Sequence, residues 1–76
     1  MNEQLSNKLL LNTKEACNYL NLNRSLLESY RRAGLIPCIK AGRNYLYPIN
    51  SLNRFVDENI GKEITKDGLI VGEADE

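Results

Sequence analysis

The sequence predicts a mostly α-helical domain with a small β-hairpin, in the order helix, turn, helix, hairpin, helix. Three observations lead to this fold class. Apolar residues recur at helical spacing in three stretches, and only three residues separate the first two stretches. A glycine-containing turn then lies between two short runs of strand-forming residues. The 76 residues provide for one small domain, in which a large substrate pocket is not expected.

The first helix is expected over residues 14–20, after an apolar entry formed by the leucines at 9–11. Thr13 is a suitable N-cap residue, and Ala16, Cys17 and Leu20 share one face at the spacing i, i+1, i+4. Asparagine tolerates the left-handed conformation that ends a helix, so Asn21 should end this one. The next helix then begins after a three-residue turn, in which Leu22 is a buried plug and Asn23 is the N-cap.

The second helix is predicted over residues 24–33, ending at Gly34. At 100° per residue, Leu27 and Tyr30 mark its buried stripe, which Arg24 and Arg31 flank. The opposite side is small, polar and charged. Its residues are Ser25, Glu28, Ser29 and Arg32.

Beyond Pro37, residues 38–40 and 45–47 are predicted to pair as two strands around a turn that carries Arg43. In the second strand the two tyrosines, Tyr45 and Tyr47, point to one side and Leu46 to the other. The pattern favours Leu46 as the side chain that packs on the second helix, with the tyrosines at the border of the hairpin. A third helix follows Pro48 and ends by about residue 59, with apolar residues at 52, 55 and 56.

The domain is therefore expected over residues 9–59, between two less regular ends. Residues 1–8 are polar apart from one leucine and should be frayed. Residues 60–76 are acidic and interrupted by three glycines, which favours a flexible tail without a fixed fold. The alternative is that the apolar triplet at 69–71 adds a strand to another element.

Charge is distributed unevenly along the chain, although the ten basic and ten acidic residues cancel. Residues 8–56 hold eight lysines and arginines against two glutamates, a net charge of +6, whereas residues 57–76 hold two lysines against seven acids, a net charge of −5. A basic domain of this kind suits binding to a polyanion, because lysine and arginine displace counterions condensed on phosphates. A merely solvated basic face is the alternative.

Several function classes are disfavoured by what the sequence lacks. There is no histidine, no C-x-x-C pair and no glycine-rich phosphate loop, so we expect no enzyme activity, no catalytic residues, no metal site and no cofactor. The two cysteines, Cys17 and Cys38, are expected to be buried thiols, with a single disulfide as the alternative. No apolar run is long enough to cross a bilayer, and we expect a cytoplasmic protein without membrane contact.

Four motifs in the expected order carry a family resemblance. They are Thr-Lys-Glu-Ala at 13–16, Leu-Asn-Arg-Ser at 22–25, Arg-Ala-Gly-Leu-Ile-Pro at 32–37 and Gly-Arg-Asn-Tyr-Leu-Tyr-Pro at 42–48. Residues 11–56 thereby resemble the excisionase-type DNA-binding domain, a minimal winged helix-turn-helix related to the MerR superfamily. The sequence departs from the family pattern at Asn21, often glycine, and at Glu28 and Ser29, often arginine or tyrosine.

The resemblance implies a sequence-specific double-stranded DNA-binding protein that acts as an excisionase-like recombination directionality factor of a mobile element. An integrase or recombinase would then be a partner, and two copies would associate on adjacent DNA sites. A small transcription regulator or repressor with the same domain is the first alternative. The second is a protein interaction module that does not bind DNA. The 20 residues beyond 56 leave no room for an effector domain, so no small-molecule effector is expected.

In the family the second helix enters the major groove and the wing reaches the flanking backbone or minor groove. Carried over by position, this implies that Arg24 contacts a guanine edge or a phosphate, and that Glu28 contacts a cytosine amino group unless it pairs with an arginine of its own helix. Arg43 at the hairpin tip is the strongest single candidate for a contact with a phosphate or with the minor groove. The full set of predicted DNA-binding residues is Lys14, Arg24, Ser25, Glu28, Ser29, Arg32, Lys40, Arg43, Asn44 and Tyr45.

Overall fold

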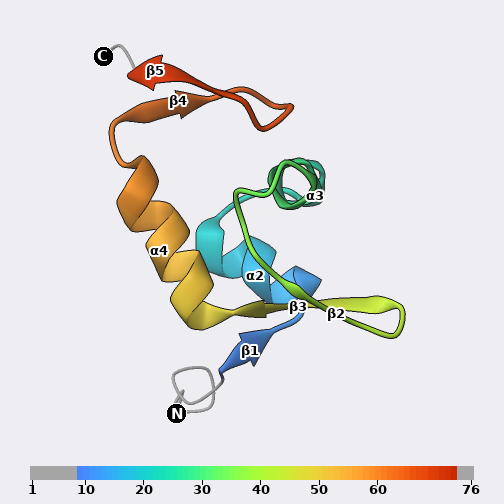
Figure 1. Ribbon diagram of the computed structural model, residues 1–76. Helices are drawn as coiled ribbons and strands as arrows, with labels where there is room; N and C mark the ends of the chain where they lie inside the picture. The colour runs from blue at the N-terminus through green and yellow to red at the C-terminus, as the bar shows by residue number, and fades with distance from the viewer. Residues whose placement is uncertain (1–8, 74–76) are drawn as a thin grey trace.

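A computed structural model describes residues 9–73, and within this range three helices and small antiparallel strands form a winged helix-turn-helix domain (Figure 1). The predicted fold class is confirmed. The expectation of a frayed segment at residues 1–8 falls outside the described range, as do residues 74–76. The helices are α2 (Thr13–Leu20), α3 (Arg24–Arg32) and α4 (Ile49–Asn59). The strands are β1 (Leu10–Leu11), β2 (Ile39–Ala41), β3 (Asn44–Pro48), β4 (Lys62–Ile64) and β5 (Ile70–Glu73).

Caps define both helices of the helix-turn-helix unit. The N-cap of α2 is Asn12, one residue before the predicted Thr13, because the Asn12 side chain accepts the Glu15 N–H at 2.8 Å while the Glu15 carboxylate accepts the Asn12 N–H at 2.9 Å. Asn21 ends α2 in the left-handed region (φ 59°), as predicted. Asn23 caps α3 by accepting the Leu26 N–H at 2.8 Å, also as predicted.

Strand β3 is the centre of a three-stranded antiparallel sheet with the order β1-β3-β2. Leu11 lies opposite Tyr47 in the β1–β3 pair, and Lys40 lies opposite Tyr45 in the β2–β3 pair. The Ile49 N–H donates to the Leu9 carbonyl at 3.0 Å, which continues the first pairing to the start of α4. The sheet therefore links the chain entry, the wing and the third helix.

The core lies where α2, α3 and α4 meet β1 and β3. The Tyr30 and Phe55 rings join α3 to α4, with centroids 5.8 Å apart. The prediction for β3 is wrong, because Tyr47 is fully buried and Tyr45 packs against the core, while Leu46 is only partly buried and lies outside the packed cluster. Pairing of β1 with β3 turns the tyrosine side of the strand inward. The buried core residues are Leu11, Ala16, Leu27, Tyr30, Ile36, Tyr47 and Leu52.

The acidic segment after α4 differs from the expectation of a tail without a fixed fold. Strands β4 and β5 form an antiparallel hairpin, in which Lys62 lies opposite Glu73 and Ile64 opposite Ile70. Ile64 packs against the domain core, which gives this hairpin the apolar anchor that an isolated pair of strands lacks. The expectation missed it because only one apolar side chain of the segment carries that contact.

Across residues 9–73, no helix is long and apolar enough to cross a membrane. Both cysteines are free thiols and both are half-buried, one on α2 and one just before β2.

Candidate nucleic-acid interface

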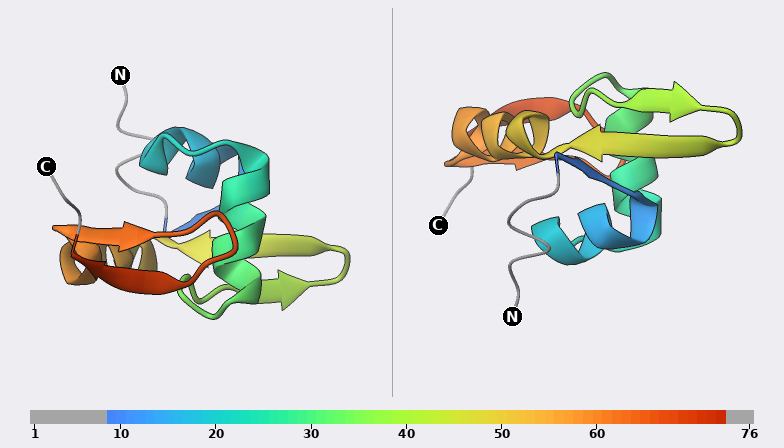
Figure 2. Two further views of the ribbon diagram at one scale, coloured as in Figure 1. Left: turned by 90° about the horizontal axis from the view of Figure 1, so that it is seen from above. Right: turned by 90° about the horizontal axis from the view of Figure 1, so that it is seen from below.

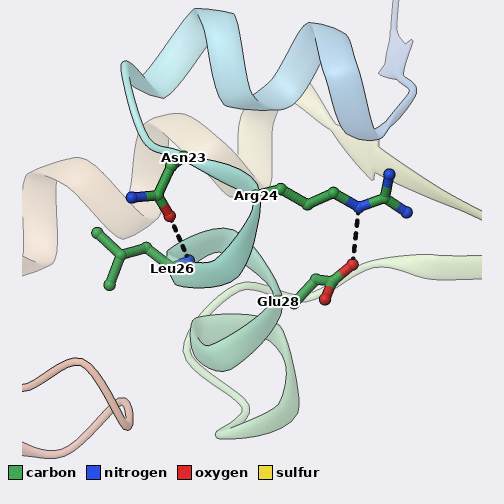
Figure 3. Close-up of polar contacts among 4 residues, drawn as sticks. All are labelled: Asn23, Arg24, Leu26 and Glu28. Carbon is green, nitrogen blue, oxygen red and sulfur yellow. Dashed lines mark hydrogen bonds and ion pairs between the residues drawn. The ribbon is translucent and has the colours of Figure 1, made fainter.

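Helix α3 presents a charged, exposed edge to solvent. Its first residue, Arg24, forms an ion pair with Glu28 one turn later, with 2.9 Å between Nε and Oε2 (Figure 3). Ser25 and Arg32 are also exposed on this helix. The intrahelical pair that the sequence left as an alternative for Glu28 is therefore present.

The ion pair changes the proton affinity of both partners. The hydrogen bond from Arg24 holds the pKa of Glu28 below its ordinary value; burial opposes this effect, and the charges of Arg24, Arg31 and Arg32 add to it. The same hydrogen bond raises the pKa of Arg24. Both groups therefore stay charged at neutral pH, and Glu28 places one negative charge among the arginines of α3.

The wing is the β2–β3 hairpin, and its tip is a tight turn at Gly42 and Arg43. Gly42 adopts φ 66°, a conformation that residues with a side chain rarely take, and Arg43 next to it is exposed. Behind the tip, the Tyr45 ring has Arg31 of α3 at 3.9 Å and Lys40 of β2 at 5.7 Å from its centroid. These cation–π contacts join the wing to α3.

A hollow of about 410 Å³ lies where the N-terminal end of α2, α3 and the wing converge. Four of its side chains are cations, namely Lys14, Arg24, Arg31 and Arg43, and Glu28 supplies the acid. The rest of the lining is polar or aromatic apart from one leucine. It consists of Asn12, Thr13, Asn44, Tyr45, Leu46 and Tyr47.

Two buried polar atoms beside this hollow have no hydrogen-bond partner in the described part of the chain, the Tyr47 hydroxyl and Arg31 Nε. Burial raises the pKa of Tyr47, although Thr13 and Arg31 lie close enough to oppose the rise by stabilising the ionised phenol. An unpaired buried donor costs free energy. Arg31 and Tyr47 both line the hollow, and its four cationic side chains make an anion the ligand that it fits.

Six of the ten predicted DNA-binding residues line the hollow together, and four do not. Lys40 is not part of the lining, although its ammonium group lies 5.7 Å from the ring centroid of the lining residue Tyr45. Ser25 and Arg32 are exposed on α3 outside the hollow. Ser29 is only partly exposed, and its backbone carbonyl is close to the C-terminal hairpin. The six residues in the hollow are Lys14, Arg24, Glu28, Arg43, Asn44 and Tyr45.

Sequence reasoning missed Arg31 and Tyr47 as members of this site. The helical spacing predicts Arg31 at the border of the buried stripe of α3. The tyrosines of the predicted second strand are the signal that could have indicated its contact with Tyr45. No signal in the sequence distinguishes the buried Tyr47 from the half-buried Tyr45, because both lie on the same side of β3.

Comparison with known proteins agrees with this geometry. The model of the helix-turn-helix domain family matches residues 10–60, which span α2, α3, the wing and α4. No curated protein and no solved structure matches the chain. Since the match covers two thirds of the 76 residues, the chain belongs to the helix-turn-helix domain family of DNA-binding proteins.

Proposed function

We propose that this protein binds double-stranded DNA sequence-specifically and acts as an excisionase-like recombination directionality factor of a mobile element. The observation that carries the DNA-binding part is the convergence of Lys14, Arg24, Arg31 and Arg43 on one hollow between α2, α3 and the wing. These cations come from three separate elements, so their gathering is a property of the fold. A phosphodiester backbone is the repeated anion that such a surface fits.

In this proposal α3 lies in the major groove and the wing follows the neighbouring backbone. The exposed residues Arg24, Ser25 and Arg32 of α3, with the partly exposed Glu28, face the base edges and adjoining phosphates. Lys14, Lys40, Arg43 and Asn44 hold the backbone beside them, and Tyr45 keeps the wing aligned with α3 through Arg31. Ser29 contributes least, because it is only partly exposed and the C-terminal hairpin lies against its backbone carbonyl.

The surface that α3 and the wing present to DNA is small, so one copy of the protein contacts few base pairs. Useful specificity then requires two copies on adjacent sites or a second DNA-binding protein. For an excisionase this means repeated sites beside an attachment site, bending of the DNA between them and contact with an integrase or recombinase. Relation to the MerR superfamily, residence in the cytoplasm and the absence of an enzyme activity or small-molecule effector belong to the same proposal.

The experiment is selection of duplexes from a random-sequence pool, followed by a bending assay on the selected site. We expect the selected duplexes to contain a tandem or repeated site. We also expect the site to be bent, so that the gel mobility of the protein–DNA complex depends on where the site lies along the fragment. Specific binding without bending would favour the regulator or repressor reading. Failure to retain any duplex at low salt would contradict DNA binding and would leave a protein interaction module as the account of the basic face.

A further inference from the structure

The C-terminal hairpin β4–β5 packs against α3, although it lies beyond the residues that the family model matches. Its turn is closed by backbone bonds from the Thr65 N–H to the Leu69 carbonyl at 2.8 Å and from the Gly68 N–H to the Thr65 carbonyl at 2.9 Å. The Thr65 hydroxyl also accepts the Asp67 and Leu69 N–H groups, at 3.3 and 3.1 Å. The turn is therefore a defined structure that holds Lys66 and Asp67 exposed at its tip.

Gly68 is the point of contact between this turn and α3. It is buried and adopts φ 86°. A Cβ at this position would lie 2.6 Å from the Ala33 Cβ and 3.2 Å from the Ser29 carbonyl oxygen. Only glycine permits so close an approach, so the turn is seated on the end of α3.

The turn and the wing contact opposite sides of α3. At 100° per residue, Ser29 lies about 160° around the helix from Arg31, whose guanidinium stacks on the wing residue Tyr45. Figure 1 shows α3 almost end-on between the two hairpins, and both turns point to the same side of the molecule. The view from above in Figure 2 shows the β4–β5 turn against α3, with the wing extending farther out in the same direction.

We propose that the β4–β5 turn is a second DNA-contacting flank of α3, with Lys66 as its backbone contact. When α3 lies in the major groove, the wing reaches the phosphates on one side and this turn approaches the phosphates on the other. Lys66 attracts that backbone and Asp67 repels it. The inference rests on the proposed DNA binding and adds a contact outside the helix-turn-helix domain.

Two matched pairs of variants test the placement of the turn. Lys66→Ala is compared with Lys62→Ala, which removes the same charge from the other end of β4, and Asp67→Asn is compared with Glu63→Gln. Binding to a random-sequence duplex is measured at several salt concentrations. We expect Lys66→Ala to weaken binding about three- to tenfold and to flatten the salt slope by ~1, while Asp67→Asn strengthens binding. Lys62→Ala and Glu63→Gln should have clearly smaller effects, because they lie farther from the turn.

Gly68→Ala tests whether seating on α3 is required. The added methyl group displaces the turn, so this variant should lose about as much affinity as Lys66→Ala, and adding Lys66→Ala to it should have little further effect. Equal effects of Lys66→Ala and Lys62→Ala, with DNA binding intact, would overturn the inference and leave the proposed function standing. Absence of DNA binding by the unaltered protein would instead refute the proposed function itself.

Discussion

Replacing Tyr47 by phenylalanine should stabilise the protein. The Tyr47 side chain is fully buried, and its hydroxyl has no hydrogen-bond partner in the described structure. An unpaired buried donor costs about 1–3 kcal/mol, whereas phenylalanine keeps the ring and its packing. Thr13 and Arg31 lie close enough to the Tyr47 hydroxyl to offset part of this cost, so the lower end of the range applies. Tyr47→Phe should therefore raise the free energy of unfolding by about 1 kcal/mol. For a domain of this size that corresponds to a Tm higher by about 4–8 °C.

Tyr19→Phe is the matched control, since it makes the same chemical change with the opposite expected sign. The Tyr19 hydroxyl of α2 donates to Asn53 Oδ1 of α4 at 2.7 Å. Its loss should lower the free energy of unfolding by about 0.5 kcal/mol, because the bond is at the surface. Thermal and urea unfolding of the two variants and the unaltered protein give the comparison. Destabilisation by Tyr47→Phe as large as that by Tyr19→Phe would refute the reasoning.

Four further predictions follow from the structure. Burial raises the pKa of Tyr47 in the folded protein, so its contribution to stability is fully present below pH 10.0, the ordinary tyrosine value, and is lost as pH rises through the higher folded-state pKa. Urea unfolding measured from about pH 9 upward should therefore show a smaller alkaline loss of stability in Tyr47→Phe than in the unaltered protein. Asn12→Ala should destabilise the protein by ~1 kcal/mol in thermal unfolding, whereas Asn12→Asp retains the cap and should not. Arg43→Ala should weaken binding to all duplexes alike and flatten the salt slope by ~1, and a loss confined to one sequence would exclude a phosphate contact. Burial raises the pKa of the Cys17 thiol, so its alkylation at pH 8 should be slower in the folded protein than in urea.

The helix-turn-helix unit could be predicted from sequence because its determinants are local. Asn21 and Asn23 specify the turn through backbone conformation and capping, and Leu27 and Tyr30 specify the inner face of α3 through helical spacing. Such features act within a few residues of the chain. The same reasoning placed the cap of α2 one residue late, since two neighbouring residues, Asn12 and Thr13, are both suitable caps and the reciprocal bonds with Glu15 decide between them.

Features that depend on tertiary contacts were not predictable in this way. Which side of β3 faces inward is decided by the pairing of Leu11 with Tyr47, from segments far apart in sequence. The C-terminal hairpin depends on the contact of Gly68 with α3 and on one apolar side chain, Ile64. The exposed cations of the candidate site could be predicted from the sequence. The stacking of Arg31 on Tyr45 could not, because it depends on how the wing folds back against α3.

Binding to random-sequence duplex DNA, measured as log affinity against log salt concentration, tests the central claim most directly. Five cations of the helix-turn-helix domain are available to phosphates in the proposed complex, and each neutralised phosphate contributes about −0.9 to the slope. They are Lys14, Arg24, Arg32, Lys40 and Arg43. We therefore expect a slope of about −4.5, whose magnitude falls by ~1 in Arg43→Ala. An affinity that does not change with salt, or no binding even at low salt, would contradict the account of this surface as a DNA interface.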